Sequence, residues 1–153
     1  MGNEKGKEQQ QNEKGKEQQQ QKQPSAIDLW EIRQILYLLE RMEKQIRSLG
    51  THRIKDWIEL AEMLWTIYDG ISECLETGKY AIGIEFATFL DDKLKRGLVK
   101  LTRGILYDTC YESTRGLTDI REMKISKKTL SALTQLTDTI NEIKKLYTEM
   151  ISS

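Results

Sequence analysis

The chain has 153 residues with 24 basic and 24 acidic side chains, so its formal net charge is zero. This balance argues against nonspecific nucleic-acid binding through an overall positive surface, although a local basic patch stays compatible with it. No apolar run approaches the roughly 18 residues of a membrane helix, and no apolar segment follows the basic start as in a secretory signal. We therefore expect a cytoplasmic protein without membrane contact.

Residues 1–24 form a polar segment in which the unit NEKGKEQQQ occurs twice in succession, at 3–20. Residues 2–23 contain only Gly, Asn, Glu, Lys and Gln, so no apolar burial can offset the entropy of ordering them. We expect a disordered, low-complexity tail that is a solvated tether or an inert extension, or alternatively a Gln-rich self-associating segment. Residues 25–153 then form one domain, long enough to bury a core.

The apolar pattern of residues 25–153 predicts long helices. Pro24 is the only proline, and the apolar residues behind it recur at alternating spacings of three and four, as in coiled coils. Caps and glycines predict four long helices: Ser25 to Gly50, Thr51 to Gly78, 92–115, and Ser126 to about Met150. Their apolar seams comprise Ile32, Ile35, Leu39, Met42, Ile46 and Leu49; Ile54, Trp57, Ala61, Leu64, Tyr68, Ile71 and Leu75; Leu94, Leu98, Leu101 and Ile105; and Leu133, Leu136, Ile140, Ile143, Tyr147 and Met150.

Residues 79–90, KYAIGIEFATFL, predict a shorter and very apolar helix between the second and third long ones. We expect a bend at Asp91, where Asp91 and Asp92 can cap the next helix; a straight helix over 79–115 is the alternative. Gly97 and Gly104 share one face and would let a neighbouring backbone approach closely. The expected fold is an all-α antiparallel bundle of four long helices plus one short helix.

Two of the predicted helices carry charge of opposite sign along one face. The acidic stripe of the second long helix consists of Glu59, Glu62, Asp69, Glu73 and Glu76. The basic stripe of the third consists of Lys93, Arg96, Lys100 and Arg103, about 15 Å long at 1.5 Å per residue. Either the stripes are solvated or cancel side by side, or each docks a partner of opposite charge. Asp91 and Asp92 would repel phosphate, which argues against a helix-turn-helix reader.

Patterns for catalysis or metal binding are scarce in the sequence. His52 is the only histidine, so neither the Glu-x-x-His pairs of di-iron bundles nor a zinc site can easily be assembled. Cys74 and Cys110 match no metal or redox spacing and predict two thiols packed as small hydrophobic groups. We therefore expect no metal, no cofactor and no enzymatic activity.

One short motif is similar to a catalytic pattern. RSLGTH, from Arg47 to His52, has the Arg-x4-His spacing of HEPN-type ribonucleases, which are also small helical bundles. The resemblance implies that His52 would act as base or acid while Arg47 steadies the phosphate. The motif lies between the first two helices, whereas that family places it late in the domain, so a ribonuclease is the remote alternative.

The sequence therefore favours a function carried by surfaces. Trp30 stands one position from the seam of the first helix, and this excess apolar surface predicts a homodimer or another protein partner. We expect a non-enzymatic interaction or structural protein that self-associates. The alternative is a regulator whose basic stripe binds either nucleic acid or an enzyme that processes nucleic acid. A perfect repeat without a catalytic motif suits a virus- or plasmid-encoded protein.

Overall fold

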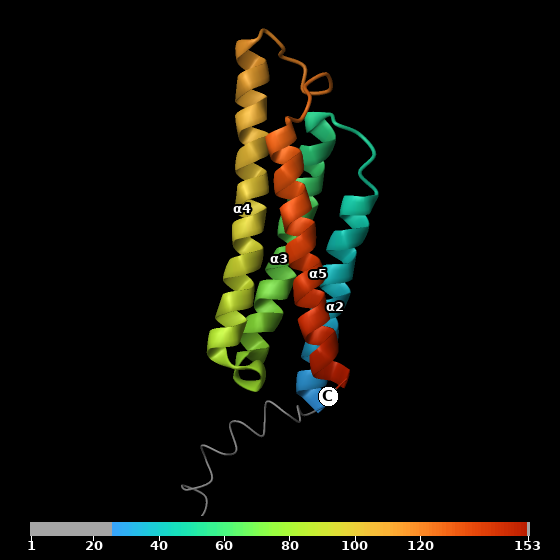
Figure 1. Cartoon of the computed structure of the whole chain (residues 1–153), viewed down its shortest axis with the longest axis vertical. Coiled ribbons are helices and arrows are strands. Elements are labelled where there is room, and N and C mark those ends of the chain that lie inside the picture. The colour runs from blue at the N-terminus through green and yellow to red at the C-terminus, as the bar shows by residue number, and fades with distance from the viewer. Residues whose placement is uncertain (1–25, 153) are drawn as a thin grey trace, which may run out of the picture.

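The computed structural model describes residues 26–152, which form four long helices lying side by side (Figure 1). They are α2 (Ala26–Arg47), α3 (Ile54–Ile82), α4 (Ile84–Thr114) and α5 (Lys127–Ser152). Helices adjacent in sequence pack together and α2 also packs against α5, so the four enclose one core. The described residues contain no strand, and the predicted all-α bundle is confirmed. The predicted tail, residues 1–24, lies outside the described residues.

Successive helices run in opposite directions, as the colour order in Figure 1 shows. Contacts between α4 and α5 agree with this arrangement. Lys93 of α4 meets Glu142 of α5, whereas Lys100, further along α4, meets Gln135, which comes earlier in α5. An up-and-down bundle of this kind brings the two connectors 48–53 and 115–126 to the same end, away from the turn at Gly83.

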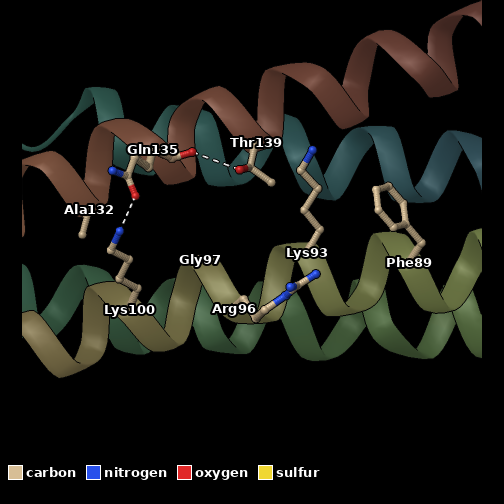
Figure 2. Close-up of a pocket in the computed structure, with 8 residues that line it drawn as sticks. All are labelled: Phe89, Lys93, Arg96, Gly97, Lys100, Ala132, Gln135 and Thr139. Carbon is tan, nitrogen blue, oxygen red and sulfur yellow. Dashed lines mark hydrogen bonds between the residues drawn. The ribbon is translucent and has the colours of Figure 1, made fainter.

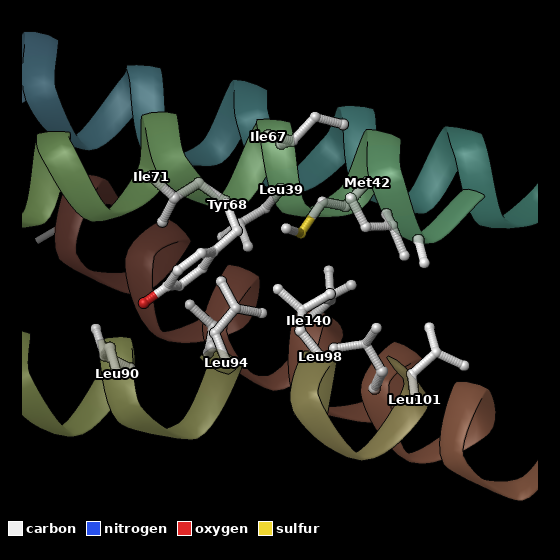
Figure 3. Close-up of a cluster of buried hydrophobic side chains, with 14 of the residues drawn as sticks. Leu39, Met42, Ile67, Tyr68, Ile71, Leu90, Leu94, Leu98, Leu101 and Ile140 are labelled. Carbon is white, nitrogen blue, oxygen red and sulfur yellow. The ribbon is translucent and has the colours of Figure 1, made fainter. Parts of the chain in front are cut away.

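The core is built from the apolar seams read from the sequence (Figure 3). Each helix contributes at least one completely buried leucine, among them Leu39, Leu64, Leu98 and Leu136. Burying one such side chain contributes roughly 1.5–3 kcal/mol. The α3 seam from Ile54 to Leu75 is buried at every predicted position. Hydrophobic burial along all four helices is therefore what holds the bundle together.

The prediction of a separate short helix over residues 79–90 is wrong. Helix α3 continues through Gly78 to Ile82, and α4 starts at Ile84. The break falls at Gly83, whose φ of 97° and ψ of 129° suit glycine alone. Gly78 stays helical because it lies against α2, where an added Cβ would be 3.6 Å from the Cβ of Glu31.

The bend expected at Asp91 is also wrong, because α4 passes straight through it. Instead of capping a helix, the Asp91 carboxylate accepts a hydrogen bond of 2.7 Å from the hydroxyl of Tyr68. Burial, together with this hydrogen bond, raises the pKa of Tyr68 to about 12. Leu90 and Leu94, on either side of Asp91, are both buried on one continuous stripe of α4.

Of the helix boundaries predicted at Gly116, Ser126 and Thr51, the structure confirms the first two and contradicts the third. Gly116 ends α4 with a φ of 89° and a pair of closing hydrogen bonds, Leu117 N–H to the Glu112 carbonyl and Gly116 N–H to the Ser113 carbonyl, which is a Schellman motif. Ser126 caps α5, since its Oγ accepts the Thr129 N–H at 3.3 Å. Thr51 does not cap α3, which starts at Ile54; its hydroxyl donates to Asp56 instead.

The two connectors at one end of the bundle are joined by their backbones. The Ile54 N–H donates to the Met123 carbonyl, and the Ile125 N–H donates to the His52 carbonyl, each at 2.8 Å. These bonds form an isolated antiparallel bridge between residues 53 and 124. We call this pairing the clasp, and it fixes the start of α3 close to the start of α5.

Candidate binding groove between α4 and α5

One face of α4 carries cations and aromatic rings in an unbroken row, which we call the basic-aromatic face. Its members follow one another at spacings of three or four: Phe89, Lys93, Arg96, Lys100, Arg103, Tyr107 and Tyr111. Residues at these spacings share one side of a helix, and the row spans about 33 Å at 1.5 Å per residue. The predicted basic stripe is its central part.

The basic-aromatic face borders an open groove between α4 and α5. The groove has a larger part of about 780 Å³ and a smaller part of about 380 Å³, which share Arg96, Lys100 and Ala132. Figure 2 shows the smaller part, where Lys93 and Lys100 reach from α4 towards α5 and Arg96 lies between them. Lys128 of α5 adds a further cation to the larger part.

Two glycines of α4 form part of the groove floor and confirm the predicted close approach of a neighbouring helix. A Cβ at Gly97 would lie 3.0 Å from Cδ1 of Leu136, and one at Gly104 would lie 2.6 Å from Oγ1 of Thr129. α5 therefore sits so close to α4 that a larger residue at either position would force the side chain of Leu136 or Thr129 to shift. The longer side chains on either side stand above this shallow floor as walls.

The cations of the groove are only partly engaged by the protein itself. Lys93 pairs with Glu142 at 2.7 Å. Lys100 donates to the neutral amide oxygen of Gln135 at 2.6 Å, and Arg96 donates to a backbone carbonyl. Within residues 26–152, Lys93 is the one member of the basic stripe with a carboxylate inside 4.0 Å. The groove is thus positively charged along its length.

The aromatic rings of this face stand open to solvent. Phe89 is 51% exposed, Tyr107 69% and Tyr111 54%, although large aromatic side chains usually bury most of their surface. Lys93 Nζ lies 5.7 Å from the centre of the Phe89 ring, and the Arg115 guanidinium lies 5.9 Å from that of Tyr111. Rings therefore flank the row of cations at both ends, and each end brings a cation close to a ring.

Among residues 26–152, one carboxylate lines the groove, and it is turned towards the protein. Asp108 is 4% exposed, and its Oδ2 accepts the Ser126 N–H at 2.9 Å and the Thr129 hydroxyl at 2.7 Å. These contacts place the carboxylate at the positive N-terminal end of α5, where the helix dipole stabilises it. Asp108 therefore anchors α5 and leaves the outer groove to the cations.

The acidic stripe lies apart from this groove. All five of its members are exposed along α3, on the side opposite the core. Their ion pairs are local, Glu59 with Lys55 at 4.0 Å and Glu76 with Lys79 at 2.6 Å. Across the described part of the chain no ion pair joins the acidic stripe to the basic stripe, so the two do not cancel each other there.

The ribonuclease-like motif lies outside the groove. Arg47 is the last residue of α2 and pairs with Glu43, while His52 is exposed and engages the clasp through its backbone carbonyl. No three His, Cys, Asp or Glu side chains of residues 26–152 gather closely enough to hold a metal ion. None of the described helices is long and apolar enough to cross a membrane.

Three other residues singled out in the sequence have different surroundings. Trp30 is 58% exposed, as expected for an interface candidate. Cys74 is half-buried, and its pKa is raised by burial and by the neighbouring Glu31 carboxylate. Cys110 is exposed, so the prediction that both thiols pack inside is wrong for this one. It lies on a side of α4 that faces solvent.

Among the aromatic and cationic residues of the groove, sequence reasoning missed Phe89, Tyr107, Tyr111 and Lys128. The signal for three of them was present, because Phe89 precedes Lys93 by four positions, and Tyr107 and Tyr111 follow Arg103 at the same interval. The basic stripe extended by these steps gives the whole face. Lys128 is brought near only by the packing of α5.

Comparison with protein families, with curated proteins and with solved structures finds no match to this chain.

Proposed function

We propose that the protein is a non-enzymatic interaction protein that binds a negatively charged partner in the groove between α4 and α5. The observation that carries this proposal is the row of cations along an open groove whose lining carboxylate, Asp108, is buried and turned towards α5. Charges that remain exposed in this way attract an oppositely charged partner and orient it. The expected location is the cytoplasm, and a viral or plasmid origin remains a prediction.

Retention on a heparin column tests this proposal, because heparin is a polyanion without aromatic groups. The full chain should be retained at low salt, and a variant with Lys100→Glu and Arg103→Glu should elute at clearly lower salt. The matched control reverses two exposed cations of α2, Arg33→Glu and Arg41→Glu, and should elute like the unaltered chain. Equal elution of both double variants would contradict binding in the groove.

Self-association is a second candidate function, and a different surface supports it. Trp30 and Tyr37 are 58% and 56% exposed and lie seven residues apart on α2, so both stand on one side of the helix. Exposed aromatic side chains are enriched where two protein surfaces meet. This pair, away from the basic-aromatic face, offers a surface that two copies can share without bringing like charges together.

Sedimentation velocity of the full chain over a wide concentration range tests self-association. The candidate predicts a species larger than a monomer, and Trp30→Ser with Tyr37→Ser should return it to the monomer. The control Tyr80→Ser removes an even more exposed ring from the end of α3 and should leave the assembly unchanged. A monomer at every concentration would exclude this candidate.

A further inference from the structure

We infer that the partner in the α4–α5 groove is a single strand of nucleic acid, with its phosphates on the cations and its bases stacked on the rings. This inference rests on the proposed function, since it names the chemical class of the anionic partner. Proteins that bind single strands combine a basic groove that follows the backbone with aromatic side chains on which bases stack. The basic-aromatic face has both components on one helix.

The positions of the rings match such a strand. Tyr107 and Tyr111 line the larger part of the groove and Phe89 lines the smaller part, so rings stand at both ends of the row of cations. Each ring is more than half exposed, which leaves a face free for a base. Bases stacked inside a duplex cannot reach these rings, so the geometry favours an unpaired strand over double-stranded DNA or RNA.

The lining of the groove disfavours an amphipathic protein helix as the occupant. Grooves that take such helices offer hydrophobic pockets for side chains repeated at three and four residues. Here the lining that residues 26–152 provide contains no Leu, Ile or Met, and its aliphatic members are Val99, Ala132 and two glycines. The remaining apolar surface is aromatic. Flat rings beside small residues suit planar bases better than branched side chains.

The size and charge of the groove predict the length of the bound strand and the salt dependence of binding. A face of about 33 Å accommodates at most about ten nucleotides at 3.4 Å each. In the described part of the chain five cations line it: Lys93, Arg96, Lys100, Arg103 and Lys128. If each contacts one phosphate, the logarithm of the binding constant falls with the logarithm of salt concentration with a slope of about −3.5, at about 0.7 per contact for single strands.

The experiment is fluorescence anisotropy of the full chain with a fluorescein-labelled 12-nucleotide oligothymidine. Tyr107→Ala and Tyr111→Ala should each weaken binding about 5- to 150-fold, the loss expected for one stacked base. Tyr107→Phe keeps a ring and should bind like the unaltered chain. Tyr80→Ala is the matched control, since this ring is exposed on α3 outside the groove, and it should have no effect.

Three further probes separate stacking from charge alone. An abasic 12-mer, a 12-base-pair duplex and polyglutamate should each bind more weakly than the oligothymidine. If the abasic strand or polyglutamate binds equally well, or if the tyrosine variants bind normally, the inference is wrong. Retention on heparin without binding of the oligothymidine would refute the inference and leave the proposed function standing, whereas loss of both would refute the two together.

Discussion

The close contact between α4 and α5 at Gly104 predicts that Gly104→Ala weakens the bundle, although alanine favours helix. The added Cβ would lie 2.6 Å from Thr129 Oγ1 and 3.2 Å from its Cγ2. Helix propensity contributes about 1 kcal/mol in favour of alanine. Overpacking costs about 1–3 kcal/mol, and turning the Thr129 hydroxyl away from the Asp108 carboxylate costs about 1.5–3 kcal/mol more. The net loss is about 1.5–5 kcal/mol.

Urea unfolding followed by circular dichroism measures this loss, and Gly78→Ala provides the matched control. At Gly78 the nearest atom to the new Cβ would be 3.6 Å away, an ordinary contact. Gly78→Ala should therefore stabilise the protein by about 0.5–1 kcal/mol. If the Gly104→Ala protein is as stable as the Gly78→Ala protein, α5 does not lie this close to α4. The description of the groove floor would then be wrong as well.

Three further predictions concern single side chains. Asp108→Ala leaves a backbone N–H and a hydroxyl at the start of α5 without their acceptor and should cost about 2–4 kcal/mol in urea unfolding, whereas Asp138→Ala, exposed on α5, should stay within about 0.5 kcal/mol. Because the folded protein holds the Tyr68 proton more tightly than the unfolded chain, the stability it contributes is complete below pH 10.0 and is lost as the pH rises to about 12. The difference in unfolding free energy between the unaltered chain and Tyr68→Phe should shrink across that window; a constant difference would contradict the raised pKa. Thiol titration with a disulfide reagent at pH 8 should show one fast group, lost in Cys110→Ser, and one slow group, Cys74; two equal rates would refute this assignment.

The sequence allowed the core to be predicted because the apolar seams depend on helical periodicity alone. It did not allow the turn between α3 and α4 to be placed, because Gly78 and Gly83 are equivalent as residues. Only packing distinguishes them: Gly78 lies against α2 within a helix, while Gly83 adopts a positive φ. Asp91 is likewise a residue type that often caps helices, but its carboxylate accepts a hydrogen bond from the Tyr68 hydroxyl across the interface between α3 and α4.

The candidate site could be predicted in part for a similar reason. The basic stripe and the close-approach glycines follow from spacing along one helix. The groove itself requires α5, since Lys128, Ala132 and Gln135 complete it from a different helix. Whether an aromatic side chain such as Tyr107 is covered or exposed also depends on the neighbouring helix. Periodicity thus identifies a face, and tertiary packing decides whether that face is open.

The clasp gives the groove two unlike ends. At one end the connector bridge holds the start of α5 through the backbone, next to Ser126, Lys128 and Tyr111. At the other end, around Phe89, side chains alone keep the two helices together, with the pair Lys93 and Glu142 nearest. Thermal motion should therefore separate α4 and α5 more at the Phe89 end of the groove than at the clasp. A long ligand would then contact one end of the groove that is rigid and one end whose width can adjust.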